Sequence, residues 1–426
     1  MPARGSVARS VSRFLFGICV VAFLLRIGAF LWLDRAHHPD VWETETVATN
    51  LLEGRGFVFH FMGTDYRSYV EPLYPWLCAA VYGLTGHSFL ALGIVQALLG
   101  TALVWLVFVC ARRMASDAIG QLAALLAAVH PGLILYATKF HPLILDSLLM
   151  AAVAAACLVW SPKRPWRSTI LVGLLVGLCT LTRPSILVCL PVIGWWVWRR
   201  SRTSRRGRLL ALGVLMVCAG LVIAPWVWRN YQIHRRVILT RSGTSMVFWL
   251  GNNPYRFTGS ALTPEGTALF DLVGDQLRGL DELAQQDFFM AQAARYVREQ
   301  PVGFLKRWGI KWWYFWWFSP QAGLLYPSSW FHLYQGCYLL ILGGALIGLW
   351  ACWRDPTGGP ARRAGPALLV GVCLAVSLVQ SLYFIEGRHR LAIEPLLLIL
   401  TAQGLAWGWG TAVRPIAVRH TPEAAS

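Results

Sequence analysis

The sequence HHPDVWETE follows the first apolar stretch of the chain, and two of its acidic residues are candidates for catalysis. Asp40 and Glu43 lie three residues apart, so a helical segment would place both carboxylates on one face. A carboxylate at a membrane surface can act as a general base. The pair also suits the start of a helix over 42–53, because acidic side chains stabilise helix N-termini. The residues alone favour this second, structural interpretation.

Basic side chains are the second feature that could do chemistry. On the orientation deduced below, a set of them lies on or near the same side of the membrane as Asp40. Arg and Lys neutralise phosphate through charge-assisted hydrogen bonds, which strengthen where water is partly excluded. Each side chain could equally reach for lipid headgroups. The set is Arg26, Arg67, Lys139, Arg183, Arg229, Arg388 and Arg390, and its last two members share the tight loop EGRHR.

A few further polar residues lie within or beside apolar runs. Asp146 lies four residues into one of them, where an ionised group is unfavourable and usually faces a polar cavity or a partner. His141, five residues earlier, is more simply interpreted as an interfacial histidine. The remaining histidines near Asp40 do not have the spacing of metal ligands, and they are His37, His38 and His60.

Membrane helices must position these residues. The chain is 56% hydrophobic and only 14% charged, with a mean hydropathy of +0.52, which is too apolar for a soluble enzyme of 426 residues. Spanning the bilayer takes roughly 20 apolar residues. The sequence therefore predicts an all-α polytopic membrane protein of about ten transmembrane helices. The apolar runs are 12–33, 88–110, 117–136, 142–160, 168–182, 184–198, 209–228, 331–352, 365–385 and 391–411.

The charge distribution predicts the orientation of these helices. A net charge of +18 would suggest nucleic acid in a soluble protein, but here most of the excess lies in short loops between apolar runs, as in cytoplasmic loops. We therefore expect no nucleic-acid partner, a cytoplasmic N-terminus and a cytoplasmic tail at 412–426. Arg26 interrupts the first run and no A-x-A site follows it, which favours a retained helix. The cysteines lack CxxC spacing, so we expect neither zinc nor disulfides.

Two segments on the opposite side are too long to be simple connectors. The first outer segment, residues 34–87, contains the amphipathic stretches TETVATNLLEGRGF and EPLYPWLCAAVYGLTG. The second outer segment, residues 229–330, contains a helix over 281–300 and the tryptophan-rich stretch 304–318. Trp, Tyr and Lys favour the headgroup zone, so we expect 304–318 to be an interfacial helix. If it crossed the bilayer instead, there would be eleven spans and the last three helices would be inverted.

Several segments resemble, in their order along residues 12–411, the membrane-embedded glycosyltransferases of the protein O-mannosyltransferase superfamily. These C-type glycosyltransferases include the aminoarabinose transferase of lipid A and the Rhizobium lipopolysaccharide galacturonosyltransferases. The resemblance implies one glycosyltransferase domain over 1–411, with a catalytic acid in the first outer segment. The similar segments are DVWETETVATNLLEGRGF, EPLYPWL, GLCTLTRPS, APWVWRNY, GNNP and GRHRLAIEPLLLIL.

The resemblance also implies a reaction. It is the inverting transfer of a sugar from a polyprenyl-phosphate donor to an envelope acceptor, which could be a glycolipid, lipopolysaccharide, polysaccharide or protein. The expected place is the outer face of a bacterial inner membrane, among membrane lipids. A flippase or transporter for a lipid carrier is the alternative, but transporters usually show paired repeats and broken helices, and no clear repeat is present.

The resemblance assigns roles to individual residues. Asp40 lies eight residues before Ala48, at the place of the family's loop acid, which makes it the expected general base. Glu43 lies where a second acid is often found. Thr44 and Glu71 replace an aromatic residue and a proline of many relatives, which weakens the assignment of the substrate. The expected phosphate-binding residues are Arg67, Lys139, Arg183, Arg388 and Arg390, supported by His141 and Asp146.

A metal requirement stays open at this stage. Some members of the superfamily bind a divalent metal with their loop acids and others do without one. Asp40, Glu43 and Asp146 are compatible with either type, so the sequence predicts no defined metal site.

Overall fold

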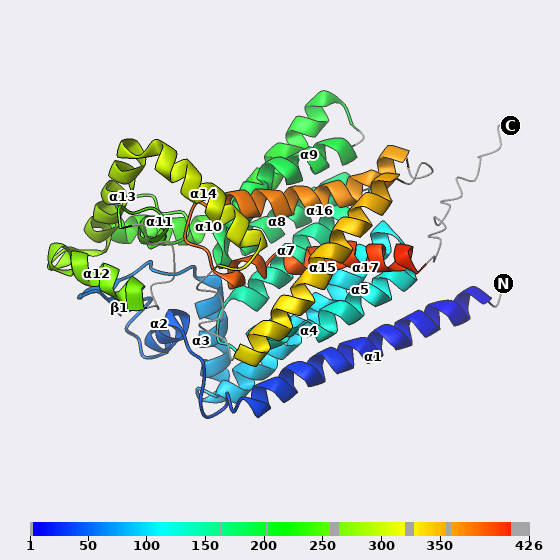
Figure 1. Cartoon of the computed structure of the whole chain (residues 1–426), viewed down its shortest axis with the longest axis horizontal. Coiled ribbons are helices and arrows are strands. Elements are labelled where there is room, and N and C mark those ends of the chain that lie inside the picture. Colours follow the sequence, from blue (N-terminus) through cyan, green and yellow to red (C-terminus); the bar gives the residue numbers. More distant parts are fainter. Residues whose placement is uncertain are drawn as a thin grey trace.

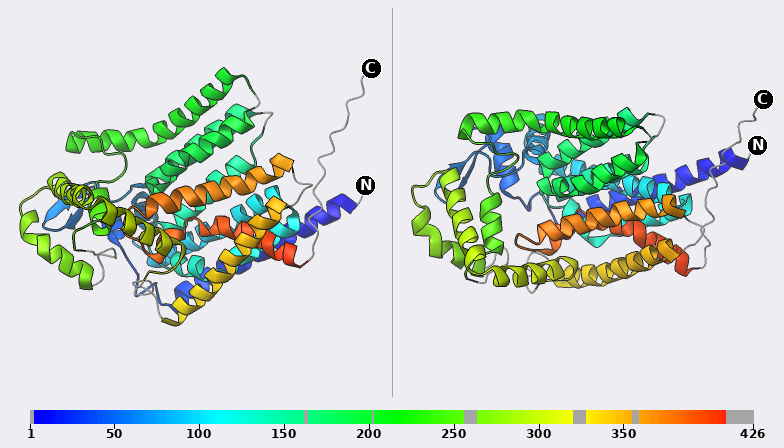
Figure 2. Two further views of the ribbon diagram at one scale, coloured as in Figure 1. Left: turned by 45° about the horizontal axis from the view of Figure 1, so that its top comes forward. Right: turned by 90° about the horizontal axis from the view of Figure 1, so that it is seen from above.

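The structure is a computed structural model that describes residues 3–161, 164–201, 203–255, 264–319, 328–354 and 359–409. Long helices run side by side in one bundle, and shorter helices of the two outer segments gather at one end (Figures 1 and 2). The start of the first helix lies at the opposite end. The predicted tail at 412–426 is outside the described residues. The helical class of the protein is thereby confirmed.

The element bounds follow in chain order. The helices are α1 (Ala3–Trp32), α2 (Glu43–Leu52), α3 (Leu73–Thr85), α4 (Phe89–Met114), α5 (Asp117–Val129), α6 (Pro131–Ala137), α7 (Leu143–Leu158), α8 (Pro165–Thr182), the 3-10 helix η1 (Pro184–Cys189), α9 (Leu190–Arg200), α10 (Arg205–His234), α11 (Thr244–Gly251), α12 (Pro264–Leu277), α13 (Glu282–Glu299), α14 (Pro301–Trp316), α15 (Ser328–Arg354), α16 (Gly359–Gln380), the 3-10 helix η3 (Gly387–Arg390) and α17 (Glu394–Gly408). The short strands β1 (Phe59–Phe61) and β2 (Thr64–Tyr66) form an antiparallel hairpin with Phe59 opposite Tyr66.

The described residues contain six helices that are long and apolar enough to cross a membrane. They lie in α1, α4, α8, α10, α15 and α16, and the bent pair α5–α6 would be a seventh span. The runs predicted at 142–160, 184–198 and 391–411 form α7, η1 with α9, and α17, which are shorter. The predicted number of about ten spans is therefore not confirmed. The helix α14, predicted at 304–318, is not among the six, and its interfacial position stays a prediction.

The α5–α6 pair bends by 53° at His130 and Pro131. Proline has no N–H to donate, so the carbonyl groups before it lose helical partners. Arg26 of α1 supplies the missing donors, because its guanidinium donates to Ala127 O and Ala128 O at 3.2 Å each. Arg26 is buried. This arginine, expected among the cations at the outer side, thus joins α1 to the broken helix.

Close contacts between α15 and α17 hold the last part of the bundle together. A Cβ atom at Gly348 or Gly404 would overlap the backbone of the facing helix. Small residues let membrane helices approach closely enough for tight van der Waals packing, which replaces the hydrophobic driving force that lipid does not provide. Helix α17 is buried along almost its whole length. The buried α17 therefore provides a fixed support for the loop that precedes it, which contains η3.

The two outer segments are joined through Glu282 at the start of α13. Its buried carboxylate accepts hydrogen bonds from Arg67 N at 2.6 Å, Ser68 N at 3.0 Å and Ser242 Oγ at 2.5 Å. The helices predicted at 42–53 and 281–300 are present as α2 and α13. The β1–β2 hairpin is a small addition to the helical architecture. Its strands are too short to show a recognisable hydrophobic period in the sequence. The joined segments form one wall of a cavity.

Candidate active site

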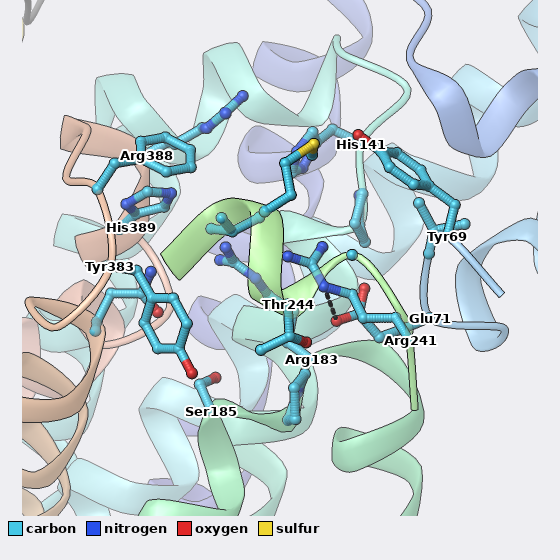
Figure 3. Close-up of a pocket in the computed structure, with 18 of the residues that line it drawn as sticks. Tyr69, Glu71, His141, Arg183, Ser185, Arg241, Thr244, Tyr383, Arg388 and His389 are labelled. Carbon is cyan, nitrogen blue, oxygen red and sulfur yellow. Dashed lines mark ion pairs between the residues drawn. The ribbon is translucent and has the colours of Figure 1, made fainter. Parts of the chain in front are cut away.

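A cavity of about 440 Å³ lies between the outer segments, η1, the end of α16 and η3. Segments far apart in the sequence line its opposite sides, with Tyr383 and His389 at the left of Figure 3 and Tyr69 and Glu71 at the right. One side is apolar, with valine and leucine side chains of η1, α11 and α16. The polar and aromatic lining side chains include Trp42, Glu43, Tyr69, Glu71, His141, Arg183, Ser185, Arg241, Thr244, Tyr383, Arg388 and His389.

Three arginines line this cavity, each beside an acidic residue. Arg183 lies between the end of α8 and the start of η1, and its Nη1 lies 3.7 Å from Oδ2 of the buried Asp146 on α7. Asp146 itself does not line the cavity, so it supports Arg183 from behind. Because one acid holds each guanidinium at a fixed place, the arginines form a preorganised cationic wall.

The other two arginines come from the second outer segment and from η3. Arg241 Nε lies 3.5 Å from Glu71 Oε1, the ion pair drawn in Figure 3. Arg388 Nε lies 2.6 Å from Glu386 Oε2, and its guanidinium lies 4.8 Å from the centre of the Trp42 ring. A cation over an indole ring gains additional stabilisation. The stacking therefore fixes Arg388 against the first outer segment.

Glu43 is the acid of the predicted pair that lines the cavity. It is the first residue of α2, and the described residues give its carboxylate no ion pair or hydrogen bond. The N-cap of α2 is Trp42, whose side chain makes no capping bond. Asp40 is therefore not the cap of this helix. The expectation that the acids stabilise the helix N-terminus holds only for Glu43, whose charge lies in the first turn.

Asp40 lies beside the cavity and is not among its lining residues. Lys139 Nζ donates to its Oδ2 at 2.5 Å, and Arg35 Nη2 lies 3.5 Å from the same oxygen. Its other oxygen, Oδ1, makes no hydrogen bond within the described part of the chain. The Asp40 carbonyl also accepts from Phe140 N at 3.0 Å, next to His141 and Pro142, which line the cavity. Asp40 and Lys139 thus form a held ion pair at its edge.

Arg390 points away from the cavity, although it is only two residues from Arg388. Its buried guanidinium lies 2.9 Å from Glu394 Oε1 and donates to Phe315 O and Trp317 O at 2.8 Å each. It thereby completes the end of α14 and fixes η3 to α17. The phosphate-binding role expected of Arg390 does not fit this position, because the side chain is fully buried and cannot reach a ligand in the cavity. Arg67 is exposed and also lies outside the lining.

Sequence reasoning missed several lining residues. Arg241 and Glu71 come from different outer segments, and their pairing has no local signal in the sequence. Glu71 was visible only as a departure from the family's double proline, and the structure pairs it with Arg241. Tyr69, Tyr383 and His389 were not singled out from the sequence, and the fold places all three at the cavity (Figure 3).

The described residues contain no group of three or more His, Cys, Asp and Glu side chains that could hold a metal ion. Asp40, Glu43 and Asp146, the acids compatible with such a site, do not come together. Asp40 is bound to Lys139 and Asp146 lies behind Arg183. The described acids therefore do not fit a metal centre.

Comparison with known proteins identifies the class of the fold. The family model of dolichyl-phosphate-mannose-protein mannosyltransferases matches residues 70–228. The solved structure of ArnT from Cupriavidus metallidurans in the apo state has a TM-score of 0.57 at 15% identity, and the match covers 95% of this chain and 62% of that one. A search of curated proteins finds no significant match.

A second similar structure is the archaeal oligosaccharyltransferase AglB from Archaeoglobus fulgidus, in complex with an inhibitory peptide and a dolichol-phosphate. Its TM-score is 0.56 at 13% identity, with 94% of this chain and 50% of that chain covered. The chain thus spans between half and two thirds of the length of these two proteins. The fold is that of the C-type membrane glycosyltransferases. The family match is confined to residues 70–228, and the similarity in fold extends over almost the whole chain.

Proposed function

We propose that the chain transfers a sugar from a polyprenyl-phosphate carrier to an acceptor of the cell envelope, on the outer face of a bacterial inner membrane. The observation that carries this proposal is the cavity that Arg183, Arg241 and Arg388 line together with Glu43, with Asp40 at its edge. The family that matches is named for a dolichyl-phosphate sugar donor, and the AglB structure contains a dolichol-phosphate. Both support a lipid-phosphate donor.

The three arginines are suited to hold the phosphate of this donor. Charge-assisted hydrogen bonds from guanidinium groups to phosphate are short and strong, and they gain strength where the cavity excludes water. The same groups stabilise the charge that develops when the phosphate leaves. The apolar side of the cavity, formed by η1 and α16, offers a surface for the first carbons of the lipid.

Asp40 is the proposed general base. In the reaction, the acceptor hydroxyl loses its proton to Asp40 while its oxygen forms a bond to the anomeric carbon. The bond from that carbon to the phosphate oxygen breaks on the opposite face, its electron pair stays with the lipid phosphate, and the configuration inverts. Lys139 and Arg35 fix Oδ2 of Asp40 and leave Oδ1 able to accept the proton.

Glu43 is the competing candidate for the base, on a specific observation. It lines the cavity and its carboxylate has no ion pair or hydrogen bond among the described residues. We assign the role to Asp40 because two cations hold its carboxylate in place, whereas the described residues give the Glu43 carboxylate no ion pair or hydrogen bond. A catalytic group must be held within a fraction of an ångström of its working geometry.

The activity is tested with purified protein in liposomes, a radiolabelled polyprenyl-phosphate sugar and crude envelope acceptor. We expect label to move to the acceptor without any ion gradient. Movement of intact carrier across the bilayer without sugar transfer would instead support the flippase alternative. The bent pair α5–α6 is a broken helix of the kind found in transporters, but the described residues contain no second one to pair with it.

Replacing Arg388 with alanine is expected to weaken donor binding by about 10- to 100-fold, the loss expected for a hydrogen bond to a charged group. The dissociation constant for labelled donor measures this change. Arg236→Ala is the matched control, because Arg236 belongs to an exposed ion pair with Asp287 on the second outer segment. If both variants bind donor like the unaltered protein, the cavity is not the phosphate site.

A further inference from the structure

Two histidines from different elements face the cavity. His141 lies in the turn before α7, and His389 lies in η3 between Arg388 and Arg390 (Figure 3). His141 packs edge-on against Trp42, with 5.2 Å between ring centres, and His389 packs against Phe384 at the same separation. These aromatic contacts limit the rotation of both rings, so each presents one nitrogen to a defined place.

The protonation of each ring is determined by its backbone partner. Nδ1 of His141 accepts a hydrogen bond from Leu143 N at 3.3 Å, and Nδ1 of His389 accepts from Glu386 N at 3.2 Å. A backbone N–H can only donate, so Nδ1 carries the lone pair in both rings. In a neutral imidazole the proton then lies on Nε2. Both Nε2–H groups are donors, and neither makes a hydrogen bond within the described ranges.

The surroundings keep both rings neutral. Burial lowers the pKa of His141 well below its ordinary value, and Arg388, Arg183, Lys139 and His389 lower it further. Burial acts in the same way on the pKa of His389, together with Arg183, Arg388 and Arg241. Glu43 and Glu71 line the same cavity. Because the folded-state pKa values of both rings are lowered, the surroundings favour their uncharged forms.

We propose that the Nε2–H groups of His141 and His389 donate hydrogen bonds to the phosphate of the lipid donor, as neutral partners of the three arginines. The inference rests on the proposed function and deepens it. A neutral donor adds a hydrogen bond to an anionic oxygen without adding a positive charge next to Arg183 and Arg388, where it would be repelled. With both protons held in place, the phosphate departs as an anion.

Two substitutions of His389 separate its two nitrogens. In His389→Gln the side-chain amide nitrogen lies near the Nε2 position, so the donor to the cavity is kept and the acceptor for Glu386 N is lost. In His389→Asn the amide oxygen lies near the Nδ1 position, so the acceptor is kept and the donor is lost. We expect His389→Asn to weaken binding of polyprenyl phosphate by about 10-fold or more, and His389→Gln by less than about threefold.

The reverse order, with His389→Asn like the unaltered protein and His389→Gln impaired, would show that His389 only caps η3 and would overturn the inference. The same pair of substitutions at His141 tests the second ring against Leu143 N. Each variant is compared as the full-length protein in one type of nanodisc, and its unfolding temperature is recorded. If a variant loses binding and its unfolding temperature is unchanged, the loss is caused by the missing contact with the ligand and not by a less stable fold.

A pH series gives a readout that a purely structural role would not affect. The probe is a polyprenyl methyl phosphate diester, whose single negative charge is constant between pH 6 and pH 8. We expect its affinity for the unaltered protein to be flat over this range. A rise in affinity towards pH 6 would show that charged histidines bind the phosphate, which overturns the neutral-donor assignment.

The two proposals fail in different ways. If the unaltered protein binds neither polyprenyl phosphate nor the diester and transfers no sugar, the proposed function fails. If it binds both ligands, and the Asn and Gln variants at both histidines bind them equally well, only the inference about the histidines fails.

Discussion

Replacing Asp40 with asparagine is expected to slow sugar transfer by about 10²- to 10⁴-fold while donor binding changes by less than about twofold. Asparagine keeps the shape of the side chain and still accepts a hydrogen bond from Lys139, but it cannot take a proton from the acceptor. The single-turnover rate of transfer, measured with donor already bound, isolates the chemical step from the binding steps.

Glu43→Gln is the matched control for this substitution. It also changes a carboxylate to an amide, three residues away and on the same outer segment, but on the wall of the cavity. We expect a smaller effect on the transfer rate, because an unheld carboxylate is poorly placed to receive the proton. If Glu43→Gln stops transfer and Asp40→Asn does not, the base is Glu43.

Replacing Arg390 with alanine is expected to destabilise the protein by about 3–5 kcal/mol, the range for removing one partner of a buried ion pair. Glu394 would be left in the interior with a charge and only His130 and Tyr334 as partners. The carbonyl oxygens of Phe315 and Trp317 would lose their donors. Thermal unfolding in detergent measures the change.

Arg388→Ala provides the contrast, since Arg388 is two residues away but lines the cavity. It is expected to unfold close to the unaltered protein while binding donor weakly. The double substitution Arg390→Met with Glu394→Leu should recover much of the lost stability, because replacing a whole buried pair with apolar side chains is often neutral. Unaltered unfolding of Arg390→Ala would show that the network around Glu394 does not stabilise the fold.

The positions of the helices could be predicted because the requirement for apolar side chains in a bilayer is local. Each predicted run coincides with a helix or a pair of helices. The breaks could not be predicted in this way. Pro131 lies inside the run 117–136, and apolar content does not distinguish a straight helix from one that bends at that residue. The same reason explains why 184–198 forms a 3-10 turn followed by a short helix.

The types of residue in the candidate site could be predicted from the sequence, but only some of the individual residues that line the cavity could. Glu43, His141, Arg183 and Arg388 line the cavity, as residues expected in or near the site. Which arginines of the loop EGRHR face inward depends on the 3-10 turn of η3, which directs alternate side chains to different partners. Arg241 and Glu71 are 170 residues apart, and such a pairing exists only once the two outer segments are folded together.

The contact between α1 and the broken helix has a consequence for the synthesis of the protein. Helix α1 leaves the ribosome before α5, so Arg26 first enters the bilayer without the carbonyl groups of Ala127 and Ala128. An arginine is unfavourable by about 2.5–3.5 kcal/mol at the centre of an inserting helix, and Arg26 lies within the apolar span Val11–Trp32. In a nascent chain that ends at α4, the insertion of α1 into the bilayer is therefore less stable than in the finished protein. The hydrogen bonds from Arg26 to α5 stabilise it once α5 has been made.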